Sequence, residues 1–188
     1  MNVLSDFFLR AKHWQIFFLV FGVCLVGQVL IVKGAHSAEE SGRASLMRLG
    51  LTVALTMFGF VFWFWSTGTF LCSFVRPDLR PRIAFFRAAI IFPVVYAFAV
   101  PSFFMSPQPE LFYLVMVPAH VFAMVCLIYD VYFVAKSLAL ALTGEPKSLP
   151  DFAGTFLLLW FFPVGVWIIQ PQINRLYRGR QTPGSPGK

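Results

Sequence analysis

Charged residues are scarce in this sequence, and acidic ones most of all. Only 12% of the 188 residues carry a charge, and Asp and Glu together number 8. Soluble domains have about 25% charged residues. Because 59% of the residues are apolar, a fold in water could not cover its surface with polar groups. The composition therefore predicts that lipid is the solvent of this protein.

Cysteine and histidine are also few, with three residues of each. The cysteines lie singly inside apolar runs, at Cys24, Cys72 and Cys126. They have neither the paired spacing of a zinc site nor the even number of a disulfide framework. The histidines are His13, His36 and His120, and only the last lies deep in an apolar run. Haem held by two histidines of one chain is not expected, and we predict no metal and no cofactor.

The recognised catalytic patterns are missing as well. The sequence has no His-Glu-x-x-His zinc motif, no Gly-x-Ser-x-Gly nucleophile turn and no nucleotide-binding loop. We therefore predict a noncatalytic protein. An enzyme that acts on lipid, with its site assembled across helices, remains the third hypothesis for function.

Long apolar runs are what the sequence does contain. The five runs are Trp14–Val32, Leu49–Val75, Ile83–Phe104, Leu111–Leu142 and Phe152–Ile169. A spanning helix needs about 20 apolar residues, whereas barrel strands alternate in polarity over about 10. The runs predict an all-α integral membrane bundle, with one multi-pass domain over residues 1–180. Residues 181–188 have a composition that predicts a disordered tail.

The first and fifth runs each leave an alternative open. A cleaved signal peptide has an apolar region of about 7–15 residues, and because Trp14–Val32 is longer, we expect a retained span. Asp151 is placed to cap the start of the fifth run. Within that run, Pro163-Val164-Gly165 predicts a break, with Trp160 and Trp167 on either side. Gly144 and Pro146 predict the end of the fourth run.

Basic residues predict the orientation, because cytoplasmic loops are enriched in Lys and Arg. If all five runs crossed from a cytoplasmic N-terminus, the basic residues would divide almost equally between the two sides. If the fifth run enters and returns, or lies at the interface, the basic C-terminal segment becomes cytoplasmic and most basic residues lie inside. We expect four transmembrane helices plus a fifth re-entrant, interfacial or kinked segment, with the N- and C-termini cytoplasmic.

The net charge of +7 does not indicate nucleic acid, because the positive residues flank apolar runs. Two arginine clusters lie beside apolar runs. Arg76, Arg80 and Arg82 form one cluster, and Arg175, Arg178 and Arg180 form the other. Each surface cation near anionic lipid contributes about 1 kcal/mol of attraction. We predict contacts between these arginines and anionic headgroups. The alternative is a stop-and-anchor sequence that only follows the charge rule.

Ionisable residues in the fourth run are candidates for function, because such residues are costly inside a membrane. His120 is the deepest of them, and Asp130 and Lys136 follow on the same run. With Tyr113 and Tyr129 they could line a path for protons or a small solute. The alternative is that His120 bonds to a neighbouring helix, while Asp130 and Lys136 mark the exit of the helix to water.

The C-terminal segment carries a pattern close to W-F-x-P-[IV]-G-x-W-x-[IV]-Q-P-x-I-N. Here it includes Trp160, Pro163, Gly165, Trp167, Gln170 and Asn174. The segment resembles the end of a group of small, uncharacterised bacterial multi-pass membrane proteins, and residues 132–138 resemble their penultimate helix. The resemblance covers about the last quarter of the chain. It implies a helical fold in a bacterial inner membrane, and it implies no activity.

These features predict an inner-membrane protein that acts by packing its helices against itself or against other membrane proteins. Thr52, Thr56 and Gly59 recur at helical spacing, and small residues on one face allow close helix contact. A small transporter or channel subunit that uses the His120/Asp130 helix is the second hypothesis. The expected partners are the lipid bilayer and a membrane protein or a second copy of this chain.

Overall fold

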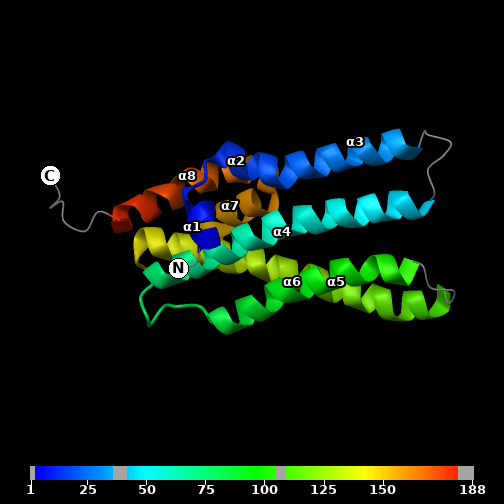
Figure 1. Ribbon diagram of the computed structural model, residues 1–188. Helices are drawn as coiled ribbons and strands as arrows, with labels where there is room; N and C mark the ends of the chain where they lie inside the picture. The colour runs from blue at the N-terminus through cyan, green and yellow to red at the C-terminus, as the bar shows by residue number, and fades with distance from the viewer. Residues whose placement is uncertain (1–2, 36–41, 105–108, 182–188) are drawn as a thin grey trace. The chain divides into compact units, whose positions relative to one another are not determined.

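The computed structural model describes residues 3–35, 42–104 and 109–181, and the regular elements in these ranges are all helices (Figure 1). This confirms the predicted all-α fold. Of the predicted disordered tail, residue 181 belongs to the last helix, which corrects that boundary, while residues 182–188 and His36 lie outside the described residues. The chain forms two compact units. Unit 1 comprises residues 1–17, 62–81 and 131–188, and unit 2 comprises residues 18–61 and 82–130.

Three of the predicted apolar runs form single long helices. These are α4 (Gly42–Phe74), α5 (Ile83–Phe104) and α6 (Pro109–Thr143). The bounds of α5 match the predicted run. The helices α4 and α6 begin before their apolar runs, because helical structure continues into the polar residues that flank them.

The N-terminal part of the chain is less regular than the sequence predicts. A separate helix, α1 (Val3–Arg10), precedes the first apolar run. The run itself divides into α2 (His13–Phe17), a π-helical turn η1 (Phe18–Gly22) and α3 (Val23–Ala35). Neither α1 nor the π-turn was expected, because a run of apolar residues does not reveal how its helix is wound.

Three helical segments are long and apolar enough to cross a membrane. They are His13–Leu30, Arg48–Phe74 and Tyr113–Thr143. The helices α7 (Leu149–Trp160) and α8 (Phe162–Gln181) qualify together as a fourth, bent segment. In α5 the apolar stretch is shorter, Ile83–Ala99. The described chain therefore has three to four candidate membrane-spanning segments, and its apolar helices fit a membrane protein.

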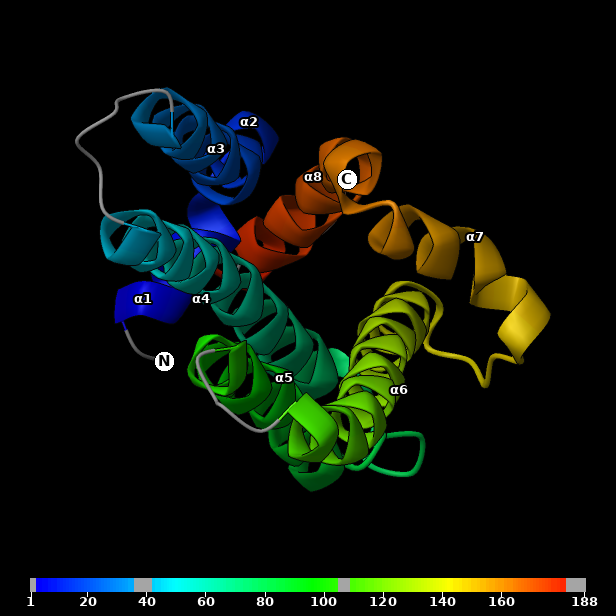
Figure 2. The same cartoon turned by 90° about the vertical axis from the view of Figure 1, so that its right-hand side faces the viewer.

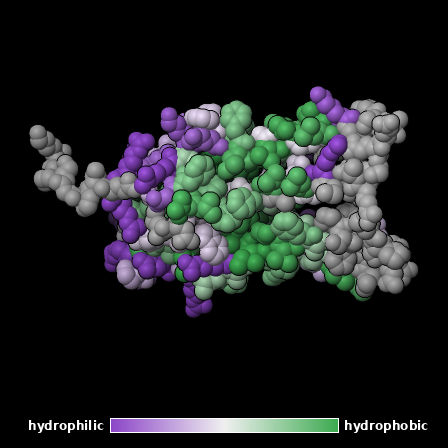
Figure 3. Space-filling model, in the orientation of Figure 1, coloured by the Kyte–Doolittle hydropathy of each residue, from purple (hydrophilic) through white to green (hydrophobic). Residues whose placement is uncertain are grey.

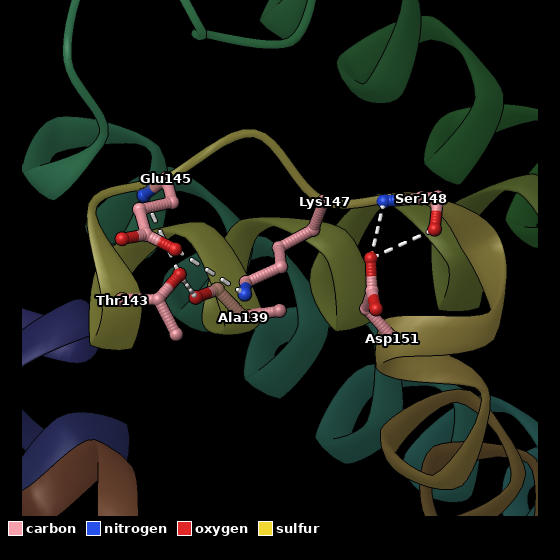
Figure 4. Close-up of polar contacts among 6 residues, drawn as sticks. All are labelled: Ala139, Thr143, Glu145, Lys147, Ser148 and Asp151. Carbon is pink, nitrogen blue, oxygen red and sulfur yellow. Dashed lines mark hydrogen bonds and ion pairs between the residues drawn. The ribbon is translucent and has the colours of Figure 1, made fainter.

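The connection from α6 to α7 (Figure 4) follows one of the predicted signals and corrects another. Gly144 has a φ of 69° and its N–H donates to the Leu140 carbonyl at 2.9 Å, so it ends α6 as expected. The start of α7 is capped by Ser148, whose N–H and Oγ both donate to Asp151 Oδ2 at 2.8 and 2.7 Å. The prediction that Asp151 is the N-cap was wrong by one turn, because Leu149 and Pro150 already belong to the helix.

A sharp corner joins α7 to α8 (Figure 2). The two helices are bent by 119° at Phe161, close to the break predicted at Pro163-Val164-Gly165. The Phe161 carbonyl accepts from the N–H groups of Val164 at 3.0 Å and Gly165 at 2.9 Å. A Cβ on Gly165 would overlap the Leu158 carbonyl oxygen. The corner therefore needs a residue without a side chain at this position.

Unit 2 contains a close contact between α3 and the first part of α4. A Cβ on Gly27 would overlap the side chain of Thr52, and a Cβ on Gly59 would lie 3.4 Å from Val20. Thr52 Oγ1 donates to the Arg48 carbonyl at 2.8 Å. Small residues at these positions allow the helices to approach closely. Thr52 and Gly59 thus lie at helix contacts, as their spacing suggested.

The helices α5 and α6 pair through aromatic rings within unit 2. Phe85 lies against Tyr129 with ring centroids 4.6 Å apart, and Phe92 lies against Phe122 at the same separation. Both pairs are edge-to-face, which is the favoured arrangement of aromatic rings. Because the residue numbers rise in α5 while those of their partners fall in α6, the two helices run antiparallel.

The core of unit 1 lies where α8 meets the second half of α4. The indole of Trp63 packs edge-to-face against Phe64 and Phe162, with centroid distances of 5.0 and 4.9 Å. All three side chains are buried. This contact places the start of α8 against α4 and sets the position of the polar residues that follow along α8.

Candidate functional site

One face of α8 carries a series of buried residues with polar groups among them. Gln170, Ile173 and Tyr177 are at most 4% exposed, and Asn174 is half-buried beside them. Their spacing of three and four residues places them on a single helix face. This face lies toward the N-terminal segment and α4, all within unit 1.

Gln170 is at the centre of the buried contacts of this face. Its Oε1 accepts from the indole Nε1 of Trp63 at 2.7 Å. Its Nε2 donates to the carbonyls of Phe8 and Ala11 at 2.9 and 3.0 Å, and to Asn174 Oδ1 at 3.0 Å. One amide thus joins three segments that lie far apart in the sequence. These five residues are called the Gln170 network.

The network satisfies the end of helix α1. The last carbonyls of a helix have no partner within it and need donors from elsewhere. Here Gln170 supplies a donor to Phe8, and Gln170 and Asn174 together supply donors to Ala11, the second at 3.1 Å from Asn174 Nδ2. The C-terminal helix therefore caps the N-terminal one.

The next helix begins directly after this cap. The Lys12 carbonyl accepts from the N–H groups of Gln15 and Ile16 at 2.9 and 3.2 Å, and the Lys12 N–H donates to Gln15 Oε1 at 2.8 Å. A glutamine that reaches back to the residue before the helix is half of a capping box. Both sides of the bend at Ala11 and Lys12 are thus hydrogen-bonded.

A second set of contacts joins the ends of α1 and α8. The hydroxyl of Tyr177 donates to Asp6 Oδ1 at 2.7 Å and accepts from Arg10 Nε at 3.3 Å. Arg10 also pairs with Asp6 at 3.3 Å. The hydrogen bond to Tyr177 raises the pKa of Arg10 further above its ordinary value, so this guanidinium stays charged.

The last turn of α8 contacts the end of α4. Arg180 Nη1 donates to Ser73 Oγ at 2.9 Å, and its guanidinium lies 5.6 Å from the ring centre of Phe74. Phe70 lies against Tyr177 with centroids 5.6 Å apart. Arg180, a predicted headgroup residue, is therefore engaged by the chain itself.

Two other predicted headgroup residues lie on a cavity beside this interface. Arg175 and Arg178 line a cavity of about 440 Å³ together with Lys12, His13, Pro171 and Asn174. This set of six is called the basic cavity. Hydrophilic side chains gather around the C-terminal part of α8 in the space-filling view (Figure 3). The structure thus brings residues of the second basic cluster together with two N-terminal residues that were not predicted.

The arginines after α4 have other surroundings. Arg76 pairs with Asp78 through contacts of 2.9 and 3.2 Å, and Arg80 donates to the Val75 carbonyl at 3.2 Å. Arg82 is exposed and is the first residue of the second segment of unit 2. These side chains are at the surface, but no cavity among those described includes them.

The two tryptophans of the motif differ in their contacts. Trp167 is 46% exposed and lies against the imidazole of His13, with centroids 4.5 Å apart. Trp160 is 42% exposed and stacks on Phe156 of its own helix. Pro163, in the first turn of α8, is exposed.

His120 lies on an exposed face of α6 and makes one described hydrogen bond. Its Nδ1 is 3.0 Å from the hydroxyl of Tyr96 on α5. Bonding to a neighbouring helix was the alternative considered for this residue. Asp130 comes ten residues later, which is about 15 Å along a helix. The structure does not bring these two side chains together.

Asp130 and Lys136 differ sharply in their environment. Asp130 is 2% exposed, and neither of its carboxylate oxygens has a hydrogen-bond partner in the part of the chain that the structure describes. Lys136 donates to the hydroxyl of Tyr132 at 3.3 Å and lies over its ring. Lys136 is satisfied within its own helix, whereas Asp130 is not.

Comparison with protein-family models, with curated proteins and with solved structures found no match.

Sequence reasoning missed most partners in this site. Asp6, Phe8, Ala11, Lys12 and Tyr177 were not singled out. A usable signal was present, because Gln170, Asn174 and Tyr177 follow helical spacing on the otherwise apolar face of Ile173. Three polar residues on one such face indicate a buried polar contact rather than a solvated surface.

Proposed function

We propose that this protein is a noncatalytic multi-pass protein of the bacterial inner membrane that packs its helices against another membrane protein or a second copy of itself. The observation that carries the proposal is that the C-terminal motif makes hydrogen bonds to other segments of this chain. Gln170 and Asn174 direct their amide groups to backbone carbonyls and to Trp63. The motif thereby holds segments together and does not present these groups to a substrate.

The surface of α3 supports a role in packing. Leu25, Val26, Val29 and Leu30 are each more than half exposed. Gly27 of the same helix contacts Thr52, and Leu25 and Val29, each two residues from Gly27, lie on the opposite face. A helix that is packed on one side and apolar on the other suits contact with lipid or with another membrane helix.

The contacts of α8 support the proposed topology of four spans and a re-entrant segment. Tyr177 bonds to Asp6, which precedes the first apolar stretch, and Arg180 bonds to Ser73, which lies at the end of the second. Two crossings return the chain to its starting side, so both partners of α8 belong to one side in this topology. The 119° bend between α7 and α8 suits a segment that enters and returns. With the positive-inside rule, we infer that this side is cytoplasmic.

The test is purification of the tagged protein from native membranes in a mild detergent, followed by mass spectrometry and sizing. We expect a stoichiometric membrane-protein partner or a stable homo-oligomer. An unrelated multi-pass protein with the same tag, purified in parallel, identifies bystanders. A monomer without a specific companion contradicts the proposal.

Asp130 favours a second candidate function, a small transporter or channel subunit. A buried carboxylate without a partner is costly in an apolar setting, and ionisable residues in membrane helices often mark proton or ion paths. Its two oxygens lack hydrogen bonds among the described residues. This candidate differs from the packing role in requiring flux across the membrane.

The two functions are separated by Asp130→Asn, which keeps the side-chain shape and removes the acid. Under the packing role, we expect co-purification with the partner to be unchanged and flux in proteoliposomes to equal that of empty vesicles. Glu145→Gln is the matched control, because Glu145 is an exposed carboxylate after α6. Wild-type flux that Asp130→Asn abolishes and Glu145→Gln retains would establish the transporter in place of the packing role.

A further inference from the structure

The basic cavity brings several cationic side chains together. Lys12, Arg175 and Arg178 line it together with the imidazole of His13. None of the described residues that line it is acidic. Side chains of one charge that converge on a single cavity create a strong local potential for an ion of the opposite charge. An anion is therefore the ligand that this cavity suits.

The walls of the cavity are held in place by the contacts of the site. Asn174 Nδ2 donates to the Ala11 carbonyl at 3.1 Å, next to Lys12, while Gln15 Oε1 accepts from the Lys12 N–H at 2.8 Å. These bonds set the backbone of Lys12 opposite the face of α8 that carries Arg175 and Arg178. A fixed backbone beneath the charged side chains lowers the entropy cost of binding.

The cavity also lies at the end of an apolar stretch. His13 is both a lining residue and the first residue of the candidate span His13–Leu30. Trp167, which packs on His13, is 46% exposed, and Ile168 is exposed to the same extent. Tryptophan is enriched at the level of the lipid headgroups. A ligand in this cavity therefore has basic groups on one side and apolar surface beside it.

A second cavity of about 230 Å³ continues the same surface. It is lined by Leu9, Arg10, Asn174, Tyr177 and Arg178, so it shares two residues with the basic cavity. The combined space along α8 exceeds what a single small inorganic anion occupies. This extent suits a phosphodiester headgroup with its attached groups.

We infer that the basic cavity binds the phosphate of an anionic phospholipid headgroup, with Lys12, Arg175 and Arg178 as its charge partners. The acyl chains of this lipid would lie along the exposed apolar surface that begins at Trp167 and Ile168. Guanidinium groups suit this role because their planar forks match phosphate oxygens. The inference is independent of the packing role, since it concerns lipid bound to the isolated protein.

The test is native mass spectrometry of the full-length protein in detergent, titrated with phosphatidylglycerol and separately with phosphatidylcholine. We expect a saturable phosphatidylglycerol adduct and much weaker binding of phosphatidylcholine. The triple variant Lys12→Gln, Arg175→Gln, Arg178→Gln should weaken phosphatidylglycerol binding about a hundredfold, since each surface cation near anionic lipid contributes roughly fivefold.

The matched control is the triple variant Lys33→Gln, Arg48→Gln, Lys147→Gln, which removes the same charge from residues outside the cavity that are not predicted headgroup contacts. It should retain wild-type binding within about twofold if attraction to the whole surface is minor. Equal losses in the two triple variants would show diffuse attraction and overturn the proposal. Equal binding of the two lipids would overturn it as well.

Two further measurements test a single arginine of the cavity and separate lipid binding from binding of a soluble anion. The single variant Arg175→Gln, at an exposed position, should keep the wild-type melting temperature and weaken phosphatidylglycerol binding roughly fivefold. Unchanged binding in this variant contradicts the assignment.

Inorganic phosphate, added as a competitor at the same concentration as the lipid, should leave the lipid adduct in place. Complete displacement by phosphate would assign the cavity to a soluble anion instead of a lipid.

Discussion

At the scale of single residues, Gln170 joins the end of α1, the middle of α4 and the face of α8. Its amide has four hydrogen-bond partners within reach while the side chain is fully buried. A buried polar group without hydrogen-bond partners lowers the stability of a fold. When its polar atoms are hydrogen-bonded, the geometry of those bonds permits only one arrangement of the segments around it. We expect this residue to contribute more to stability than its size suggests.

The substitution Gln170→Leu tests this expectation. It would leave the indole N–H of Trp63 and the Phe8 carbonyl without their described partners. Each buried group left unpaired costs about 1–3 kcal/mol. We therefore predict a clear loss of stability, measured as a lower melting temperature and earlier unfolding in a denaturant titration in detergent.

Gln172→Leu is the matched control for this prediction. Gln172 has the same side chain on the same helix, but its amide donates only to the Ile168 carbonyl at an exposed position, at 3.3 Å. Surface substitutions usually change stability by less than about 0.5 kcal/mol. Equal losses in the two variants would mean that the Gln170 network does not hold unit 1 together.

At the scale of elements, the corner between α7 and α8 decides where the polar face of α8 points. Gly165 permits the Leu158 carbonyl to approach the backbone of α8, and the Phe161 carbonyl closes the turn. A glycine allows such an approach because it has no Cβ. If the corner opened, Gln170 and Tyr177 would rotate away from their partners in α1.

Gly165→Ala should open this corner. The added Cβ overlaps a backbone oxygen, which cannot move without moving the helix, and overpacking of this kind typically costs about 1–3 kcal/mol. We expect lower stability together with a changed distance between spin labels placed on α7 and α8. Gly154→Ala is the control, because a Cβ there meets nothing within 4 Å and alanine favours a helix. An unchanged label distance in Gly165→Ala contradicts this account of the corner.

At the scale of the whole molecule, the main question is which side of the membrane receives the C-terminus. The contacts of α8 with α1 and with the end of α4 favour the side of the N-terminus. The charge distribution independently favours the cytoplasm for the basic C-terminal segment. A five-span arrangement would place Arg175, Arg178 and Arg180 on the opposite side from Asp6 and so would separate these contacts.

Reporter fusions after Lys188 provide the measurement. We expect green fluorescent protein to fluoresce there and alkaline phosphatase to stay inactive, which indicates a cytoplasmic C-terminus. Fusions after Asp78 should behave in the same way, whereas fusions at His36 should show the reverse. Active alkaline phosphatase after Lys188 would restore the five-span topology and contradict the re-entrant segment.

Much of the architecture could be predicted because it depends on properties that are local in the sequence. Continuous apolar runs predict helices, since a backbone in lipid must satisfy its own hydrogen bonds. The bounds of α5, the end of α6 at Gly144 and the break near Pro163 followed from such local signals. The N-cap at Ser148 was missed by one turn, because Ser148 and Asp151 are both good capping residues and only the backbone shows which one precedes the helix.

The sequence by itself predicted lipid as the solvent, and it determined the all-α class and the approximate helix boundaries of this protein, because composition and periodicity act within a few turns of one helix. Only the tertiary structure decided that Gln170 caps α1, that Tyr177 meets Asp6, and that Lys12 joins Arg175 and Arg178 at one cavity. These residues are separated by more than 150 positions. Their contacts depend on the corner at Gly165 and the bend at Lys12, and the directions of these two turns are set by packing between segments rather than by local propensity.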